Sequence, residues 1–241
     1  MRYVDKYASQ VATFCEVCHT LAKRLYVTGH GGNLAWKLED DLILITPTRL
    51  NKGEVEADDV VFARLSGEKV EGRRNPTGEL PMYVNFFRER PDIVSVLHCH
   101  PPMTGAFAIT KGKNWLMRPL FPETVTEVGP VPVVPYGEPL TQRLADAFLP
   151  YLPKYNAFLM ENHGLVIMSR GDIGWTLMNT ELLEMTSTTI LQAALLGDIK
   201  EIGLADVRNL DNIMRTRELP LMGAPGVNKS LVDLYFPAQG A

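Results

Sequence analysis

Basic segments, long apolar runs and signal-peptide features are scarce in this 241-residue sequence. Its 24 Lys and Arg residues against 28 Asp and Glu give a formal charge of −4, and no basic run is long enough to follow a nucleic-acid backbone. Apolar runs such as residues 158–160 and 165–168 fall far short of the roughly 20 residues that cross a bilayer. The first residues lack an apolar signal-peptide core. We therefore expect no nucleic-acid partner, no membrane association and a cytoplasmic location.

Cysteine is also rare, with three residues in the chain. An odd number in a chain of this length excludes a disulfide framework and favours reduced thiols. Cys15 and Cys18 form a CxxC pair inside a segment whose apolar residues recur at helical spacing. Because no second CxxC completes four metal ligands, we predict that the pair packs in the core, with a metal or redox role as the alternative.

Length and composition predict one domain over residues 1–241, with 46% hydrophobic and 22% charged residues. The apolar periodicity predicts helices at residues 4–24, 80–90, 103–110, 140–149 and 173–196. Short apolar segments predict strands at residues 34–37, 42–45, 60–65, 69–71, 93–97, 131–136, 157–160 and 165–168. The first four of these strands form an antiparallel meander. A loop-rich tail is expected from about residue 204, where proline and glycine become frequent.

Three of the five histidines occur where a metal site could use them. His98 and His100 are two residues apart at the end of a predicted strand, so both imidazoles point to the same side. His163 lies in the turn between two apolar strands and could complete a three-histidine set with an open fourth position. The alternative for His98 and His100 is a hydrogen-bonded pair without metal.

Glu79 and several tight turns are the other candidates. Glu79 begins a predicted helix, where it could act as a general base beside a metal or serve only as a carboxylate favoured by the helix dipole. The turns at residues 31–33, 46–48 and 76–78 could present N–H groups and hydroxyls to a phosphate. They match neither a Walker motif nor a dinucleotide fingerprint. Three unrelated tight turns are the alternative.

The order of these motifs resembles the class II aldolase/adducin family, and within it the L-fuculose-1-phosphate aldolases. The resemblance runs from the first helix to about residue 196. It rests on Gly31-Gly32-Asn33, Thr46-Pro47-Thr48, Pro76-Thr77-Gly78-Glu79, His98-Cys99-His100-Pro101 and Asn162-His163-Gly164. It implies an α/β fold with three layers, α/β/α, around a mostly antiparallel central sheet. It also implies a homotetramer with active sites at subunit interfaces.

The resemblance further implies a zinc-dependent aldolase, with Mn²⁺ or Co²⁺ as alternative ions. His98, His100 and His163 would bind the metal, and Glu79 would transfer the proton. The reaction would be reversible cleavage of a ketose 1-phosphate to dihydroxyacetone phosphate and a small aldehyde. Substrate phosphate would be bound by Gly32, Asn33, Thr48, Arg49, Thr77 and Gly78.

This chain departs from the fuculose phosphate aldolase pattern at three positions. Arg49 stands where those enzymes have glycine, and Gly78 where they have serine. Phe121 stands where they have a tyrosine that protonates the leaving oxygen, and phenylalanine has no proton to donate. Glu123 is a second candidate for the substrate pocket, with a helix cap or an ion pair as its alternative role. The apolar residues near Phe121 favour an aldehyde with a deoxy or thioether end.

Three other functions remain open at this point. Sugar-phosphate 4-epimerases and decarboxylases of oxo-acid phosphates occur in the same family and use the same metal. The third alternative is a non-catalytic interaction module like the adducin head, which lacks the metal histidines. Retention of His98, His100, His163 and Glu79 favours an enzyme over that module.

Overall fold

The computed structural model describes residues 2–237, and in these residues eight strands form one sheet. The strand order is β4-β3-β2-β1-β5-β8-β7-β6, and every neighbouring pair is antiparallel except β6 and β7. The strands are β1 (Asn33–Glu39), β2 (Leu42–Ile45), β3 (Val61–Ala63), β4 (Lys69–Glu71), β5 (Ser95–Cys99), β6 (Val133–Val134), β7 (Ala157–Met160) and β8 (Gly164–Ser169). The predicted meander of the first four strands is confirmed.

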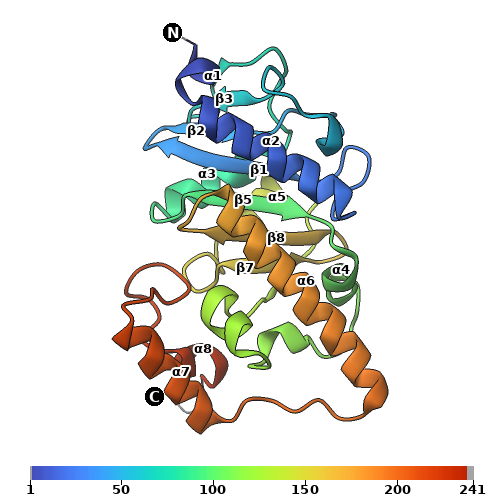
Figure 1. The fold of residues 1–241 in the computed structure, drawn as a ribbon, viewed down its shortest axis with the longest axis vertical. Coiled ribbons are helices and arrows are strands. Elements are labelled where there is room, and N and C mark those ends of the chain that lie inside the picture. The colour runs from blue at the N-terminus through green and yellow to red at the C-terminus, as the bar shows by residue number, and fades with distance from the viewer. Residues whose placement is uncertain (1, 238–241) are drawn as a thin grey trace.

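Helices cover both faces of this sheet (Figure 1). α2 and α6 cross the face turned to the viewer, whereas α3 and α5 lie behind it. The α-helices are α1 (Tyr3–Lys6), α2 (Ala8–Lys23), α3 (Leu80–Glu89), α4 (Pro102–Ala108), α5 (Gln142–Ala147), α6 (Ile173–Leu196), α7 (Leu204–Thr216) and α8 (Leu231–Tyr235). Short helical turns occur at η1 (Lys52–Glu54), η2 (Trp115–Met117) and η3 (Thr124–Val128). This arrangement confirms the predicted α/β fold.

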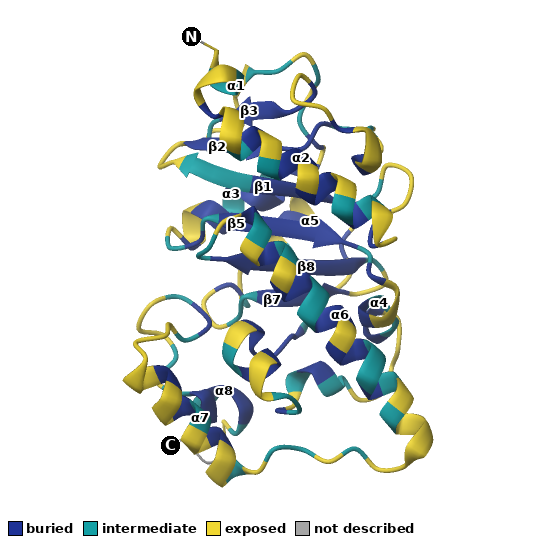
Figure 2. Ribbon diagram, viewed as in Figure 1, coloured by how far each residue is buried: buried dark blue, intermediate teal, exposed yellow. Residues whose placement is uncertain are grey.

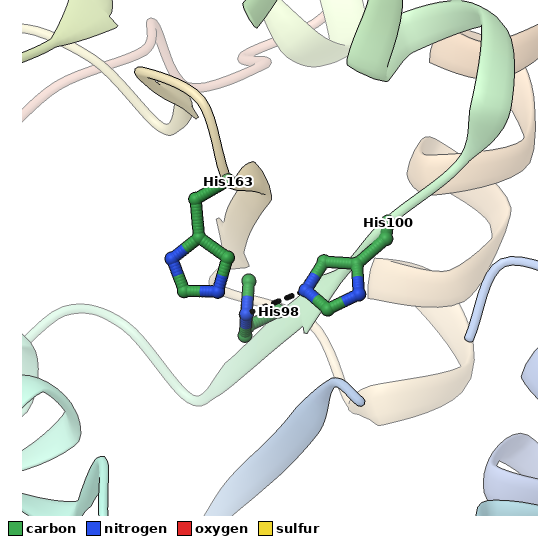
Figure 3. A group of neighbouring side chains, drawn as sticks. All are labelled: His98, His100 and His163. Atoms are coloured by element: carbon green, nitrogen blue, oxygen red, sulfur yellow. Dashed lines mark hydrogen bonds between the residues drawn. The ribbon is translucent and has the colours of Figure 1, made fainter. Parts of the chain in front are cut away.

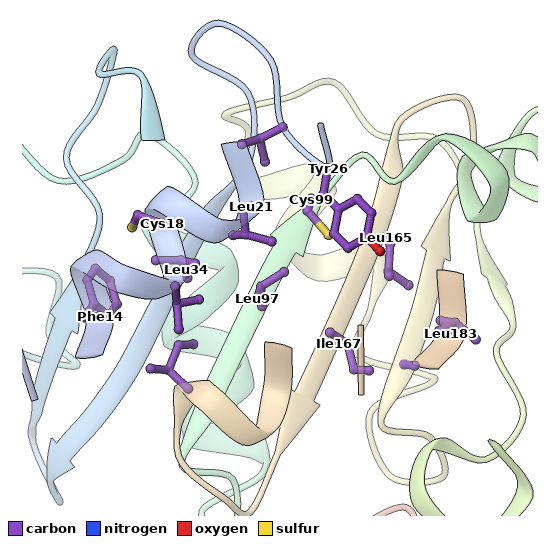
Figure 4. Close-up of a cluster of buried hydrophobic side chains, with 14 of the residues drawn as sticks. Phe14, Cys18, Leu21, Tyr26, Leu34, Leu97, Cys99, Leu165, Ile167 and Leu183 are labelled. Atoms are coloured by element: carbon purple, nitrogen blue, oxygen red, sulfur yellow. The ribbon is translucent and has the colours of Figure 1, made fainter. Parts of the chain in front are cut away.

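The two sides of the sheet bury separate hydrophobic cores because neighbouring strand residues point to opposite faces. Leu34 and Leu97 pack with residues of α2 and α6 (Figure 4). Ala35 and Val96 pack with residues of α3 and α5. Figure 2 shows the central strands buried between exposed outer helix surfaces. The central part of the sheet is therefore covered on both faces, whereas the edge strand β4 is mostly exposed.

The cysteines lie in the core of the α2 side. Cys15, Cys18 and Cys99 are free and buried, and all three belong to the same hydrophobic cluster. Burial raises the pKa of all three thiols above the ordinary value, that of Cys15 to about 11. These thiols are therefore protonated at neutral pH, which confirms the packing role predicted for the CxxC pair.

The prediction of a loop-rich tail from about residue 204 holds for residues 217–230, which form no helix or strand, but is wrong for residues 204–216 and 231–235. α7 spans Leu204–Thr216 and α8 spans Leu231–Tyr235, and both bury residues in a third hydrophobic cluster. Val207, Leu210 and Met214 recur at helical spacing on the inner face of α7, where Val207 and Met214 are buried and Leu210 is half-buried. The proline and glycine residues that suggested a loop lie after this helix. Within residues 2–237, no helix combines the length and the apolar character needed to cross a membrane.

Candidate active site

Three neighbouring strands bring the candidate residues together at one end of the sheet, where the strands begin or finish. Asn33 at the start of β1 is paired with His98 near the end of β5, and Cys99 is paired with Leu165 near the start of β8. His163 immediately precedes β8, in the turn that follows β7. Antiparallel pairing therefore places the start of β1, the end of β5 and the start of β8 side by side.

The three histidines converge at this end of the sheet (Figure 3). The ligand nitrogens of His98, His100 and His163 all lie within 4.8 Å of one another. Nε2 of His98 lies 3.2 Å from Nε2 of His100. Two imidazole nitrogens on one tetrahedral zinc would lie about 3.3 Å apart, given a Zn–N distance of about 2.05 Å. The spacing therefore fits a shared metal ion.

The donor set also has the protonation state that a metal needs. Burial lowers the pKa of His98 to about 3 and that of His100 to about 3, with neighbouring histidines adding to each shift. Nδ1 of His98 lies 2.9 Å from the carbonyl oxygen of Leu165, which fixes the ring and turns Nε2 toward the other histidines. Nδ1 of His163 is buried and has no hydrogen-bond partner among the described residues. These neutral rings fit a divalent cation.

Glycines next to the histidines allow the close packing of His100. A Cβ added at Gly164 would lie 2.5 Å from Cδ2 of His100, and one added at Gly31 would lie 3.0 Å from its Cε1. Gly32 has a φ of 66°, and a Cβ there would lie 2.8 Å from the carbonyl oxygen of His98. A side chain at Gly31 or Gly164 would displace the His100 imidazole, and one at Gly32 would displace the backbone that carries His98, so the glycine motifs support the histidine cluster.

Glu79 lies beside the cluster and is held by a buried polar network. It precedes α3, is 5% exposed, and its Oε2 lies 3.7 Å from Nε2 of His98. Nδ2 of Asn33 donates to the same Oε2 at 2.8 Å. The hydroxyl of Tyr83 lies 2.6 Å from Oδ1 of Asn33 and 2.7 Å from its carbonyl oxygen. Tyr83 therefore orients the Asn33 amide, and Asn33 orients the carboxylate.

A cavity of about 210 Å³ opens beside these groups. The histidines and Glu79 share it with all the residues predicted to bind phosphate, namely Gly32, Asn33, Thr48, Arg49, Thr77 and Gly78. The rest of the lining is His30, Gly31, Pro47, Lys52 and Leu140. Phe121 and Glu123 do not line it; they precede η3, and Glu123 is exposed. The structure thus brings together every predicted site residue except these two.

Several groups expected to face an anion are already used within the chain. The N–H of Thr48 donates to the carbonyl of Asn75, and the N–H of Thr77 donates to the carbonyl of Thr46. These bonds join the turns at residues 46–48 and 75–77 into one wall of the cavity. The side-chain amide of Asn33 donates to Glu79. The hydroxyl groups of Thr48 and Thr77 are therefore what these threonines can offer a ligand.

Two residues of this site were not found by sequence reasoning. Tyr83 lies four residues after Glu79, so helical spacing could have placed it on the same face as the carboxylate. Lys52 is 1% exposed, yet it lines the cavity. No local pattern indicates that burial, because it depends on the packing of η1 against α2 and on the contact of Lys52 with the glycine-rich turn.

Comparison with known proteins identifies a matching family and several relatives of similar sequence. The model of the Class II Aldolase and Adducin N-terminal domain matches residues 12–191. A 3-oxo-tetronate 4-phosphate decarboxylase of Pectobacterium atrosepticum is 34% identical over 180 residues, which is 74% of this chain and 80% of the relative. A 5-deoxy-D-ribulose 1-phosphate aldolase of Bacillus thuringiensis serovar kurstaki is 32% identical over 184 residues, covering 76% and 84%.

A solved structure gives the same assignment. YgbL of Klebsiella pneumoniae, named as a candidate aldolase, epimerase or decarboxylase, superposes with a TM-score of 0.77. The two sequences are 32% identical, and the match covers 84% of this chain and 98% of YgbL. The family match includes every predicted site residue from Gly32 to His163. The chain therefore belongs to the class II aldolase and adducin N-terminal domain family.

Proposed function

We propose that this protein is a metal-dependent carbon–carbon lyase that decarboxylates a phosphorylated 3-oxo acid. The observation that carries the proposal is the position of Glu79, a buried carboxylate beside three neutral histidines in a cavity with polar turns along one wall. His98, His100 and His163 would hold a divalent ion, with zinc as the preferred one. When bound, the ion would supply positive charge beside the substrate oxygen atoms that become negative as the bond breaks.

The protein's own acid–base groups favour decarboxylation over aldol cleavage. Loss of CO2 from a 3-oxo acid leaves an electron pair on the carbon beside the carbonyl, and that carbon then takes up one proton. Glu79 in its acid form can deliver this proton and then regain one from solvent, and Asn33 holds its side chain next to the histidines. Aldol cleavage needs a second group to take the proton of the substrate hydroxyl. The cavity of one chain is lined by one carboxylate and, among the described residues, by no tyrosine.

The second candidate is the aldolase predicted from the sequence, which would release dihydroxyacetone phosphate and a small aldehyde. The similarity to a 5-deoxy-D-ribulose 1-phosphate aldolase favours it. It needs a further acid–base group, and we propose a homotetramer in which another subunit could supply one near Phe121 or Glu123. A non-catalytic adducin-like module is disfavoured by the complete histidine cluster. A cytoplasmic location is part of this proposal.

Turnover of three substrates tests which bond is broken. Zinc-loaded protein would be incubated with 3-oxo-tetronate 4-phosphate, L-fuculose 1-phosphate and 5-deoxy-D-ribulose 1-phosphate, with dihydroxyacetone phosphate and CO2 both measured. We expect dihydroxyacetone phosphate and CO2 in equal amounts from the first substrate and little product from the others. Release of an aldehyde from either sugar phosphate without turnover of the oxo acid would establish the aldolase instead.

Metal content tests the histidine cluster. We expect about one zinc ion per chain in the wild type and loss of at least about nine-tenths of it in His163→Ala, because two histidines remain of a three-ligand set. Metal analysis after dialysis gives the measurement. His19→Ala is the control, since His19 contacts the Val55 carbonyl from α2 and lies outside the cavity. Full zinc content in His163→Ala would remove His163 from the metal site.

Tyr83→Phe tests whether the orientation of Glu79 matters. The substitution removes the hydroxyl that contacts Asn33, leaving a buried amide oxygen without that partner. A loss of about 1–2 kcal/mol of positioning energy would lower kcat roughly tenfold, with KM little changed. Tyr155→Phe is the control, because Tyr155 is half-buried and packs against the hydrophobic cluster that contains Tyr83. Equal kcat in Tyr83→Phe and wild type would show that Asn33 holds Glu79 without help.

A further inference from the structure

Lys52 is a buried cation that faces the cavity without an anionic partner. Its residue is 1% exposed, and Nζ donates to the carbonyl oxygen of Leu50 at 3.0 Å and more weakly to that of His30 at 3.4 Å. An ammonium group has three N–H donors, so one remains. No ion pair joins Lys52 to a carboxylate within the described part of the chain. The side chain nevertheless belongs to the lining of the active-site cavity.

Burying the charge of Lys52 is unfavourable unless an anion binds beside it. Lysine is almost never fully buried unless it is paired, because desolvation of the charge is expensive. Burial lowers the pKa of Lys52, while the nearby Glu79 charge opposes that shift. The Cys18 thiol beneath it is protonated, since burial raises the pKa of that group. An anion bound in the cavity would therefore supply the missing counter-charge.

The position of Lys52 identifies which anion this is. Its two carbonyl partners belong to the glycine-rich turn before β1 and to the segment just after Thr48. The ammonium group thus lies between the two turns predicted to bind phosphate. In that wall, the N–H groups of Thr48 and Thr77 are already bonded within the chain. A phosphate there needs a charged partner in addition to the threonine hydroxyls.

The substrate carboxylate is the other anion to consider. Pairing the leaving carboxylate with a buried ammonium would stabilise the ground state more than the transition state and slow the release of CO2. A phosphate is unchanged during the reaction, so pairing it with Lys52 strengthens binding without this penalty. The chemistry therefore favours phosphate at Lys52.

We propose that Lys52 is the charged anchor of the substrate phosphate, bound between the glycine-rich turn at residues 29–32 and the turn at residues 46–50. This assignment rests on the proposed function, because it requires a phosphorylated substrate. It adds a positive charge to a subsite for which sequence reasoning supplied hydroxyls, glycines and the exposed Arg49. Uniform binding of the phosphate lowers KM and leaves kcat little changed.

Binding of inorganic phosphate to the zinc-loaded protein tests the anchor without any turnover. We expect phosphate to raise the melting temperature of the wild type in a saturable way, as a ligand specific for the folded state does. Lys52→Gln keeps a hydrogen-bond donor but removes the charge, and should raise the apparent Kd for phosphate at least tenfold. Lys52→Arg keeps the charge and should bind phosphate within a few-fold of wild type. Acetate at equal ionic strength should produce no comparable shift.

Controls separate the anchor from a structural role. Lys37→Gln should leave phosphate binding unchanged, because Lys37 also donates to a backbone carbonyl but lies outside the cavity. Zinc content and the phosphate-free melting temperature of Lys52→Gln report whether the site is intact. If the melting temperature of Lys52→Gln without phosphate is well below that of wild type, the phosphate affinity of Lys52→Arg decides the test.

The possible results divide cleanly. The anchor would be overturned if Lys52→Gln and wild type bound phosphate with equal affinity, or if wild type bound no phosphate. It would also be overturned if a well-folded Lys52→Arg lost phosphate binding, or if acetate raised the melting temperature as much as phosphate does. Charge-dependent phosphate binding with none of the three substrates turned over would support the anchor and refute the proposed reaction. Where turnover occurs, Lys52→Gln should raise KM at least tenfold, and an unchanged KM would also overturn the proposal.

Discussion

Glu79→Gln protein should bind zinc as the wild type does and lose activity by a factor of about 10²–10⁴, the contribution typical of a positioned acid–base group. Glutamine cannot deliver or collect the proton, whereas its amide oxygen can still accept the hydrogen bond from Nδ2 of Asn33. The substitution therefore removes the chemistry and keeps the geometry. The measurement is kcat for dihydroxyacetone phosphate release, together with zinc content.

Glu161→Gln is the matched control for this substitution. Glu161 lies in the turn before His163 and accepts a hydrogen bond from the N–H of Tyr136, but it is exposed and does not line the cavity. Its activity should stay within about twofold of wild type. A Glu79→Gln protein that is metal-loaded, stable and still fully active would exclude Glu79 as the proton-transfer group.

The metal cluster was predictable because each of its signals is local. The alternation of side chains in a strand predicts that His98 and His100 lie together, and the turn residues predict that His163 lies at a strand end. That a neighbouring strand brings His163 to the other two histidines was a hypothesis from its position in the turn, and the family resemblance strengthened it. Pairing of β5 with β8 brings them together in the structure.

Other parts of the site depend on contacts that no short pattern contains. The hydrogen bonds that consume the N–H groups of Thr48 and Thr77 come from two turns almost 30 residues apart. Burial of Lys52 depends on how η1 packs against α2, a contact between segments about 30 residues apart. Helix α7 differs in kind, because the prolines and glycines that indicate a loop all lie beyond residue 219. Its apolar spacing was present in the sequence and was sufficient to predict it.

The second large effect concerns stability and is expected from Asp92→Asn. Arg90 is completely buried, and its guanidinium group forms two 2.9 Å hydrogen bonds with the Asp92 carboxylate. Nε of Arg170 donates to the same carboxylate at 2.9 Å. Both arginines also donate to the carbonyl of Gly223, so the carboxylate supports the attachment of the C-terminal segment.

Removing the charge of Asp92 leaves two clustered guanidinium groups, one of them buried, without their counter-ion. Breaking one partner of a buried pair typically costs about 3–5 kcal/mol, and the lower end applies here because Arg90 retains carbonyl partners. For a chain of this size, about 3 kcal/mol corresponds to a fall of roughly 6–12 °C in melting temperature. Thermal unfolding at pH 7 gives the measurement.

The pKa of Asp92 predicts how the difference in stability between wild type and Asp92→Asn varies with pH. The hydrogen bonds and charges of Arg90 and Arg170 hold the pKa of Asp92 below its ordinary value of 3.8, against the opposing effect of burial. A carboxylate whose pKa is lower in the folded state contributes its stability above the unfolded pKa and loses it as the pH falls through the folded pKa. Wild type and Asp92→Asn should therefore differ fully at pH 6–7 and converge below about pH 4.

Glu138→Gln separates this effect from the loss of an ordinary ion pair. Glu138 pairs with Arg143 at 3.0 Å, but both side chains are more than half exposed. An exposed pair contributes little, so this variant should melt close to wild type at every pH. A similarly small effect in Asp92→Asn would mean that carbonyl groups alone satisfy Arg90. Because Asp92 lies at the end of the sheet opposite to His98 on β5, its loss should lower the melting temperature while leaving zinc content at 25 °C unchanged.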